Sequence, residues 1–379
     1  MSEAAIANAV AVMQSGRLHR YNTLDGEAGE VAELEAEYAE WQGAPYCLAT
    51  GSGGAAMQIA LRALGVKPGD AVLTNAFTLA PVPGAIAAAG GVPIFVETTD
   101  ELTVDFTDLM RKFEQTNAKV FLASHMRGHL ADMEKLAALV AGYGAQMIED
   151  CAHTMGAAWN GKPSGNFGTV ACFSTQTYKH LNSGEGGFLT TSEPAVMARA
   201  TILSGSYMLY GRHLARPDDE AYASARLEMP NCSSRMDNLR AAILRAQLPN
   251  LRANIERWNE RYRAVEAQLE MASGLNAIER PEAESIVGSS IQFTLPKGDD
   301  AAMRDFVVRC SERGVELKWF GDGQPVGFTS RYDSWTYAPP QELPQTTRVL
   351  SRLMDMRIPL SFSVEDCTLI GRIIADEAS

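Results

Sequence analysis

The sequence predicts an α/β fold, in which a large domain with a mostly parallel sheet flanked by helices precedes a smaller C-terminal α+β domain. Short apolar strands alternate with helical segments from residue 31 to residue 191. A glycine-rich turn, Gly51-Ser52-Gly53-Gly54, joins one strand to the next helix. The chain has 379 residues, of which 46% are hydrophobic, and this is enough for two hydrophobic cores.

The first part of the chain supplies the elements of the large domain. Apolar residues interleaved with acids predict the first helix, and short β-branched runs bounded by turn residues predict the strands. We expect helices at 31–41, 55–64, 83–89 and 133–143. We expect strands at 45–49, 70–75, 92–96, 119–123, 146–149, 169–173 and 188–191.

A long helical pattern follows at 236–271, and Pro249 is expected to kink or divide it. The later segments predict the smaller domain: 290–295, 304–310, 315–319, 346–354 and 363–374. Residues 1–245 would form the N-terminal arm and large domain, and residues 246–379 the linking helix and small domain. The weak periodicity of 211–230 predicts a long loop, and loops of this length are often functional.

Charge and composition exclude several classes of function. A net charge of −13 argues against nucleic acid or an anionic membrane as the main partner. None of the six cysteines forms a Cys-x-x-Cys pair, so we expect reduced thiols, no metal site and a cytoplasmic location. The N-terminus has no basic region typical of a signal peptide. Prolines and glycines interrupt the apolar run 79–96, which therefore does not predict a membrane span.

Lys179 is the main catalytic candidate because of its surroundings. A lysine after a strand is usually a solvated surface charge, but this one leads into the glycine-rich turn 184–187. Asp150 ends an apolar strand upstream. A lysine that forms an imine, a carboxylate that pairs with a ring nitrogen and a glycine turn that holds a phosphate are the parts needed to bind pyridoxal 5′-phosphate (PLP). Burial would lower the pKa of such a lysine and supply the neutral amine.

The residues around Asp150 admit structural and functional interpretations. An aspartate at a strand end commonly caps a helix or a turn, whereas here it would keep the cofactor ring nitrogen protonated. Glu149 is less suited, because strand alternation directs it to the opposite face of the sheet. His153 would lie beside the cofactor, and His125, at another strand end, is a weaker candidate for the same pocket.

The turn at Gly51 also fits G-x-G-x-x-A, so a dinucleotide site with Asp70 as the ribose ligand is an alternative. Either ligand would place a phosphate on free amides at a helix N-terminus. A PLP phosphate accounts for more of the downstream residues, and Ser174 is a candidate hydroxyl donor to it. Asn231 could contact a phosphate or substrate across a subunit boundary, whereas Ser233 or Ser234 could cap the following helix.

Taken together, these segments resemble the DegT/DnrJ/StrS aminotransferases, the sugar aminotransferase group of fold type I PLP enzymes, which share an aspartate-aminotransferase-like fold. The resemblance covers almost the whole chain. It is carried by the segments 60–70, 76–78, 91–96, 149–153, 173–174 with Lys179, 184–187, 241–243 with Gln247 and Leu248, and 358–360.

The resemblance implies a homodimer whose active sites lie at the subunit interface. Lys179 would be the imine lysine and proton shuttle, and Asp150 would hold the ring nitrogen. The remaining implied cofactor contacts are His153 beside the ring, Ser174 with Ser52, Gly53 and Gly54 at the phosphate, and Asn231 at the phosphate of the partner subunit. The implied activity is transfer of an amino group from glutamate or glutamine to a carbonyl acceptor, such as a nucleotide-linked keto-sugar.

Four departures from the family pattern bear on these expectations. The family usually has Gly-Thr where this chain has Gly53-Gly54, and an aromatic ring over the cofactor where this chain has Leu79. Relative to the family pattern, two extra residues lie between Asn231 and Arg235. Segments 205–230 and 319–324 match no nucleotide-sugar pattern, so a simpler ketone or aldehyde is also a candidate acceptor.

Three rival functions follow from the same residues. A PLP-dependent sugar dehydratase would carry histidine at the lysine position, and His180 is adjacent to Lys179. An NAD-dependent oxidoreductase would use the Gly51 turn. A non-catalytic PLP-binding regulator would need a nucleic-acid-binding extension or basic patch, which the sequence does not suggest.

Overall fold

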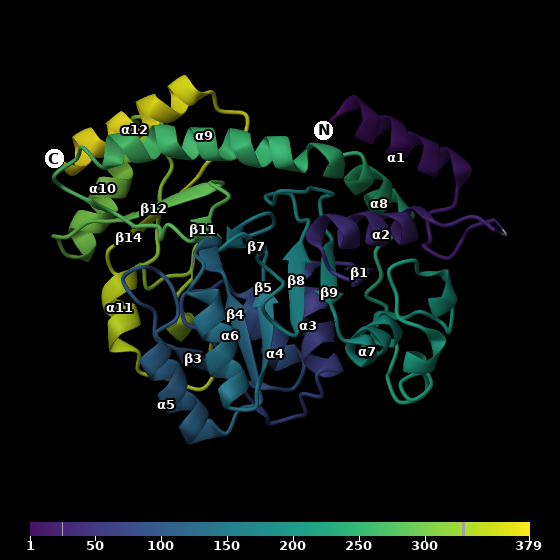
Figure 1. Cartoon of the computed structure of the whole chain (residues 1–379). Coiled ribbons are helices and arrows are strands. Elements are labelled where there is room, and N and C mark those ends of the chain that lie inside the picture. The colour runs from purple at the N-terminus through teal and green to yellow at the C-terminus, as the bar shows by residue number, and fades with distance from the viewer. Residues whose placement is uncertain (25, 328–329) are drawn as a thin grey trace.

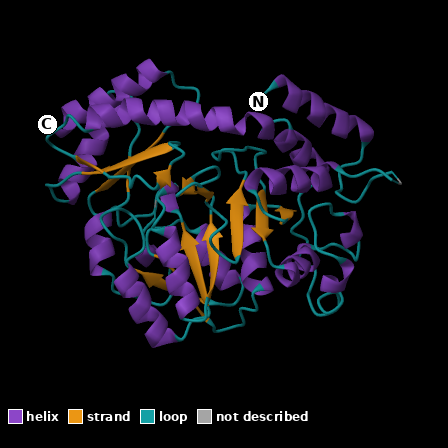
Figure 2. Cartoon of the chain, in the orientation of Figure 1, coloured by secondary structure: helices purple, strands orange, loops and turns teal. Residues whose placement is uncertain are grey.

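A computed structural model describes residues 1–24, 26–327 and 330–379 (Figure 1). A large seven-stranded sheet lies between two layers of helices, and a smaller four-stranded sheet follows in the C-terminal part of the chain. The arrangement of strands inside and helices outside is visible in Figure 2. The predicted α/β fold class is therefore confirmed.

The large sheet has the strand order β1-β9-β8-β5-β4-β2-β3. β9 pairs antiparallel with both of its neighbours, and the pairs from β8 to β3 are parallel. The strands are β1 (Tyr46–Thr50), β2 (Ala71–Asn75), β3 (Val92–Val96), β4 (Val120–Ser124), β5 (Gln146–Asp150), β8 (Val170–Ser174) and β9 (Gly187–Thr191). The carboxyl ends of β4, β5 and β8 therefore meet at one edge, where open α/β sheets bind ligands.

Side-chain alternation along the strands builds a core on each face of this sheet. Leu48 of β1 joins the core under α3 (Gly53–Ala63), α4 (Pro81–Ala88) and α7 (Pro194–Ser204), whereas Cys47 and Ala49 join the core on the opposite face. That opposite face is covered by α2 (Glu30–Gln42), α5 (Phe106–Thr116), α6 (Met133–Gly142) and α8 (Asn238–Arg245). The helix α1 (Glu3–Ser15) packs beside α8 (Figure 1).

The smaller sheet has the order β10-β12-β14-β13. Its strands are β10 (Asn276–Ala277), β12 (Ser290–Thr294), β13 (Lys318–Trp319) and β14 (Leu353–Arg357), and its helices are α10 (Asp300–Glu312), α11 (Pro344–Leu350) and α12 (Val364–Ala378). The long helix α9 (Leu251–Leu269) lies beside α12 and contributes to the same core (Figure 1). A third sheet joins β11 (Glu284–Ser285) to β6 (Ala158–Trp159) and β7 (Lys162–Pro163).

Most predicted elements match the observed ones to within a few residues at each end. Pro249 divides the long helical pattern, as predicted, because it lies in a 3₁₀ turn (Leu248–Asn250) between α8 and α9. The predicted segment 346–354 is in fact two elements, the end of α11 and the start of β14. The predicted loop 211–230 contains 3₁₀ turns, Tyr210–Arg212 and Asp219–Tyr222.

Among the residues that the structure describes, three helices lie outside the predicted set: α1, α5 and α7. α5 buries Leu109 and Phe113 together with Asp108 and Lys112, and its strongly one-sided pattern was a signal that the sequence analysis overlooked. α7 is buried on several sides and lacks a one-sided apolar pattern. No helix within the described residues is both long and apolar enough to cross a membrane.

Candidate active site

A cavity of about 310 Å³ lies where β5 and β8 end and α3 begins. Most of the predicted site residues line it together, although they come from distant parts of the sequence. The lining residues used below are Ser52, Gly53, Gly54, Leu79, Ser124, Asp150, His153, Ser174, Gln176 and Lys179. The volume falls within the usual range for small-molecule sites.

Lys179 contacts His153 directly. The Nζ of Lys179 lies 2.8 Å from Nε2 of His153, and Nδ1 of His153 accepts a hydrogen bond from the amide of Arg127 at 3.3 Å. Because Nδ1 is an acceptor, the proton of the neutral imidazole is on Nε2. Burial, followed by the charges of Lys179 and Arg127, lowers the pKa of His153 well below its usual range. The neutral ring therefore donates Nε2–H to the lone pair of the lysine amine.

The electrostatic surroundings of Lys179 favour its neutral form. Burial lowers the pKa of Lys179 to about 7, and the cations Arg127, Arg357 and Lys318 act in the same direction. Asp150 opposes this shift. A substantial fraction of the lysine is thus an unprotonated nucleophile at neutral pH.

Asp150 is a buried carboxylate at the end of β5. Its Oδ2 accepts a hydrogen bond from Ser124 at 3.2 Å, and its Oδ1 accepts one from the amide of Ala152 at 3.1 Å. Thr78 donates in turn to Ser124 at 2.8 Å. Burial raises the pKa of Asp150, although Lys179 opposes the shift. Both of these hydrogen-bond donors to Asp150 are uncharged. A protonated ring nitrogen placed beside this carboxylate would supply a positive charge to pair with it.

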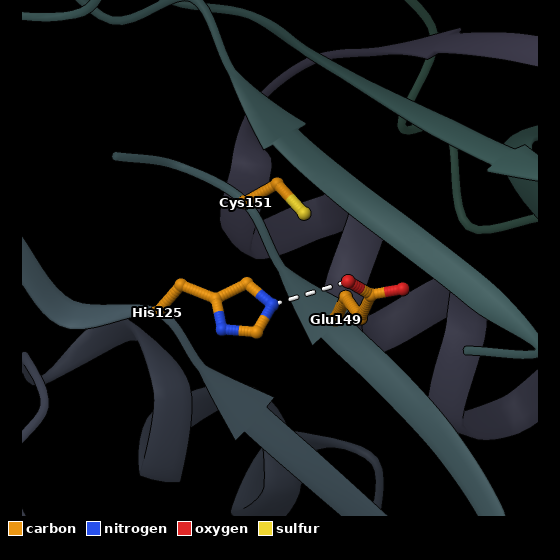
Figure 3. A group of neighbouring side chains, drawn as sticks. All are labelled: His125, Glu149 and Cys151. Atoms are coloured by element: carbon orange, nitrogen blue, oxygen red, sulfur yellow. Dashed lines mark hydrogen bonds and ion pairs between the residues drawn. The ribbon is translucent and has the colours of Figure 1, made fainter. Parts of the chain in front are cut away.

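Glu149 lies on the other side of the strand, among His125 and Cys151 (Figure 3). It accepts hydrogen bonds from the amides of Gly165, Phe167 and Gly168, and from His125 Nε2 at 3.2 Å. Burial alone would raise the pKa of Glu149, but His125 and these amides outweigh it and lower the pKa. This carboxylate therefore anchors the chain before β8, and its oxygens are already occupied by donors.

The three side chains in Figure 3 are close enough together to bind one metal ion, but the Cys151 sulfur is not in the thiolate form that binds metals. Their ligand atoms lie within 4.8 Å of one another. Burial raises the pKa of Cys151 well above its usual range, so its sulfur is a neutral thiol. Cys151 Sγ lies 3.4 Å from Ser164 Oγ, a hydrogen-bond distance for sulfur.

The N-terminus of α3 forms the other end of the cavity. Ser52 caps the helix, since its Oγ accepts a hydrogen bond from the amide of Ala55 at 3.0 Å. A Cβ at Gly53 would lie 2.9 Å from Cβ of Ser174, so only glycine fits between α3 and β8. Free first-turn amides beside a serine hydroxyl form an anion-binding site.

Two predicted residues, Asn231 and His125, lie outside the lining of this cavity. Asn231 is exposed, is absent from the lining of this cavity, and accepts hydrogen bonds from the amide and hydroxyl of Ser233. His125 lies beneath the strand ends with Glu149, rather than on the cavity wall. Leu79 does line the cavity, and of the described lining residues His153 alone carries an aromatic ring.

Several residues of the site were absent from the sequence predictions. Ser124 ends β4, beside β5, so the rule that parallel strand ends converge would have found it. Arg127, Lys318 and Arg357 approach Lys179 from segments that no motif connects. These residues are found from the folded structure rather than from a sequence motif, because Lys318 and Arg357 lie on β13 and β14 of the smaller sheet.

Comparison with known proteins identifies the family. Residues 1–374 match the model of the DegT/DnrJ/EryC1/StrS aminotransferase family. This chain belongs to that family. It is therefore an aminotransferase, and its cofactor is pyridoxal 5′-phosphate.

Three of its similar proteins illustrate the range of the family. A pleiotropic regulatory protein of Geobacillus stearothermophilus is 33% identical over 71% of this chain and 70% of its own length. The dTDP-3-amino-3,4,6-trideoxy-α-D-glucose transaminase of Streptomyces venezuelae is 30% identical over 87% of this chain and 77% of its own length. The crystal structure of 3-amino-5-hydroxybenzoic acid synthase has a TM-score of 0.84 and 25% identity, and the alignment covers 100% of this chain and 96% of the synthase.

The cavity of this aminotransferase fits the cofactor. It combines a half-buried lysine, a buried carboxylate that has no cationic hydrogen-bond donor among the described residues, and an anion-binding helix N-terminus. The oxidoreductase and dehydratase alternatives are not favoured, because the cofactor is PLP and the named relatives include transaminases.

Proposed function

We propose that this aminotransferase moves an amino group from glutamate or glutamine to the carbonyl of a sugar, with a nucleotide-linked keto-sugar as the first candidate. The observation that carries the proposal is the Lys179 amine, with a pKa of about 7, in contact with His153 at the cavity that Asp150 lines. The sugar acceptor is supported by the name of the Streptomyces venezuelae relative, a transaminase that forms an amino sugar.

Lys179 is the proposed catalytic residue. When bound, PLP supplies an aldehyde that condenses with amines and a ring that withdraws electrons from the substrate carbon. The neutral Lys179 amine provides the attachment point for that aldehyde and afterwards carries a proton to and from the substrate carbon. His153 donates Nε2–H to the amine, and this contact holds the amine within the cavity in its neutral form.

Asp150 and the start of α3 are the proposed anchors for the two ends of the cofactor. Asp150 would pair with the ring nitrogen, and Ser124 and Ala152 hold the carboxylate in place. Ser174, Ser52 and the amides of 53–54 would bind the phosphate. Leu79 would contact the ring by apolar packing where relatives of the family have an aromatic side chain.

A homodimer with shared active sites is part of the proposal. The segment 205–235 carries a group of exposed apolar side chains, which supports an interface there: Tyr207, Met208, Leu209, Leu214 and Leu227. Asn231 lies in the same segment and would reach the phosphate of the partner subunit. Mixing Lys179→Ala with Asn231→Ala protein should restore part of the activity, because one site of the mixed dimer would be intact. A monomer by sedimentation, or no recovery, would contradict this assignment.

The proposed attachment of the cofactor to Lys179 is tested by trapping the bound cofactor chemically. Borohydride reduction of the loaded enzyme, digestion and mass spectrometry should find the cofactor on the peptide that contains Lys179. Lys179→Ala should lose multiple turnover and the visible absorption of the bound cofactor. An adduct on another peptide, or full turnover by the variant, would remove Lys179 from the proposal.

The acceptor is tested with the amino form of the loaded enzyme. Nucleotide-linked keto-sugars, free keto-sugars and simple ketones are mixed with it in turn, and the spectrum of the amino form is followed. Rapid loss of that spectrum with the nucleotide-linked compounds is the expected result. Equal rates with simple ketones would instead favour the smaller acceptors.

We also propose that the chain divides into two domains at residues 245 and 246 and that the protein lies in the cytoplasm. The division of the chain at residues 245 and 246 is supported by a separate core that contains residues from Tyr262 to Ile374. Limited proteolysis that cuts first within this boundary region would support it. The cytoplasmic location is supported by six free cysteines, which suit a reducing compartment.

A further inference from the structure

Three neighbouring strands of the large sheet end beside a row of buried polar side chains, the strand-end series Thr78, Ser124 and Asp150. Asp150 ends β5, Ser124 ends β4, and Thr78 follows the end of β2. These strands are adjacent and parallel, and Ser124 pairs directly with Asp150 in the register of β4 and β5. None of the three side chains is more than 8% exposed, so protein groups rather than bulk water determine their hydrogen bonds.

The hydrogen bonds of the strand-end series run in one direction. Thr78 Oγ1 donates to Ser124 Oγ at 2.8 Å, and Ser124 Oγ donates to Asp150 Oδ2 at 3.2 Å. A hydroxyl has a single hydrogen, so the bond accepted from Thr78 leaves the hydrogen of Ser124 for the carboxylate. Because an ionised carboxylate can only accept, Asp150 fixes the direction of the whole series.

The two hydroxyls are coupled through the oxygen that they share. The distance of 3.2 Å is at the long end for a hydroxyl donor, so the strength of this bond depends on how strongly the O–H is polarised. A donor that bonds to the same oxygen increases that polarisation. Thr78 should therefore strengthen the bond from Ser124 to the carboxylate.

The backbone around the two hydroxyls is held by separate contacts. The amide of Ser124 donates to Oδ1 of Asn75 at 2.9 Å. The amide of Phe77, which precedes Thr78, donates to Oγ1 of Thr98 at 3.2 Å. Neither contact uses a hydroxyl of the series, so removal of those hydroxyls should leave the strand ends in place.

Thr78 lies outside the cavity that the series serves. Ser124 and Asp150 line the cavity of about 310 Å³, whereas Thr78 is not among its lining residues. Thr78 is therefore placed to influence a ligand of that cavity through Ser124 rather than by contact.

The series counteracts the burial of Asp150. Burial raises the pKa of Asp150. Four groups oppose this rise: Lys179, the amide of Ala152, His125 and Ser124. The help of Lys179 requires its protonated form, and burial lowers the pKa of Lys179 to about 7. Once Lys179 is neutral, the uncharged donors to Asp150 become more important for keeping its carboxylate ionised.

We infer that Thr78 and Ser124 are positioning residues that act in series on Asp150 and hold its carboxylate in the ionised form that pairs with a cationic ring nitrogen. The inference rests on the proposed function, and it deepens that function by adding a residue that lies behind the ring anchor. Thr78 polarises and directs the Ser124 hydroxyl, and Ser124 bonds to the carboxylate.

Titration of Asp150 in the cofactor-free full chain tests the series. Carbon-13 NMR of aspartate-labelled protein follows the carboxyl, and its signal is assigned by its loss in Asp150→Asn. Ser124→Ala should raise the pKa of Asp150, because a donor to the ionised form is removed. Thr78→Val should raise this pKa by a smaller step, and Thr78→Ser, which keeps the hydroxyl, should restore most of the difference.

A double variant distinguishes a series from two independent contacts. If Thr78 acts through Ser124, Thr78→Val should produce no further shift in the Ser124→Ala protein. An equal shift in both backgrounds would show that Thr78 affects Asp150 by another route, and this result would overturn the series. An unchanged pKa of Asp150 in both single variants would overturn it as well.

Thr74 supplies a matched control on the same strand, β2. It is fully buried, and its hydroxyl donates to the carbonyl oxygen of Leu122 at 2.8 Å rather than toward a carboxylate. Thr74→Val removes one buried hydroxyl, as Thr78→Val does, but it should leave the titration of Asp150 unchanged. A shift as large as that of Thr78→Val would assign the effect to general destabilisation and reject the series.

Binding of a cofactor analogue connects the series to the site. 4-Deoxypyridoxine 5′-phosphate lacks the aldehyde, so it binds without reacting with Lys179. At pH values where Asp150 is mostly protonated, each unit by which a variant raises its pKa should weaken binding about tenfold. Calorimetry should find weaker binding in Thr78→Val and recovery in Thr78→Ser. Unchanged binding despite a shifted carboxyl would overturn the inferred link between this carboxylate and the ring.

The two sets of measurements separate this inference from the proposed function. Coupled shifts of Asp150 in a protein whose Lys179 forms no cofactor adduct would retain the series and reject the proposed function. A cofactor adduct on Lys179 without these shifts would retain the proposed function and reject the series.

Discussion

The 2.8 Å contact between Nζ of Lys179 and Nε2 of His153 fixes the direction of one hydrogen bond in the site. Because the amide of Arg127 donates to Nδ1, the imidazole donates to the amine, rather than the reverse. Lys179, the proposed attachment point of the cofactor, is therefore hydrogen-bonded in its neutral form. The position of the Arg127 amide thus affects the protonation of Lys179 through the His153 imidazole, which contacts both groups.

His153 and Asp150 should shift the pKa of Lys179 in opposite directions. His153→Ala removes a donor to the neutral amine, so the pKa of Lys179 should rise from about 7 by a fraction of a unit to one unit. Asp150→Asn removes the charge that favours the ammonium, so the pKa should fall. The pH dependence of Lys179 acetylation in cofactor-free protein measures both values. Shifts of the same sign would contradict the assigned direction of the hydrogen bond.

The depressed pKa of Lys179 should also appear in the stability of the cofactor-free protein. The folded pKa of about 7 lies below the ordinary lysine value of 10.5, so between these pH values the unfolded chain binds more protons and stability rises with pH. Lys179→Met removes this contribution. The variant should be more stable than the wild type by about 2 kcal/mol near pH 7, given about 1.4 kcal/mol per pKa unit and the partial exposure of the lysine.

Urea unfolding at pH 7 and pH 9.5 checks this expectation. The free-energy gap between Lys179→Met and the wild type should narrow as pH rises, because removing the proton that the unfolded amine carries costs less free energy as pH approaches 10.5. A gap that is constant across this range would show that the lysine titrates normally in the folded protein.

Much of this site was predictable because its parts lie at strand ends. Asp150 and Ser174 end apolar strands, and the glycine turn 51–54 precedes a helix, so a parallel sheet brings them to one edge. The sequence resemblance then connected Lys179 to this edge. Arg127, Lys318 and Arg357 could not be predicted in the same way, because their convergence depends on how the smaller sheet packs against the chain after β4. The helix α7 was missed for a related reason, since burial on several sides removes its periodicity.

Glu149 should be a determinant of stability rather than of chemistry. Four donors converge on this fully buried carboxylate, and three of them are backbone amides of residues 165–168. Glu149→Ala should lower the free energy of unfolding by about 3–5 kcal/mol, because buried donors lose their partner. Glu149→Gln keeps an acceptor and should cost less. Urea unfolding of both variants measures the difference.

The same contacts predict how this cluster responds to metals. Since the Glu149 oxygens are occupied and Cys151 is a neutral thiol, zinc or a chelator should leave the melting temperature of the wild-type protein unchanged. A rise with zinc that Cys151→Ser abolishes would instead show that His125, Glu149 and Cys151 bind the metal.

Gly53 and Gly54 are adjacent, yet alanine should affect them differently. A Cβ at Gly53 would lie 2.9 Å from Cβ of Ser174 and 3.3 Å from the carbonyl oxygen of Phe173, so the start of α3 must move away from β8. At Gly54 the nearest atom would be Ser52 Oγ at 3.8 Å, an ordinary contact. In cofactor-free protein, Gly53→Ala should therefore destabilise by about 1–3 kcal/mol. Gly54→Ala should stabilise by up to about 1 kcal/mol, because alanine has the higher helix propensity. Urea unfolding measures the change in the free energy of unfolding for each variant. Equal changes would mean that the packing of α3 against β8 does not require glycine at position 53.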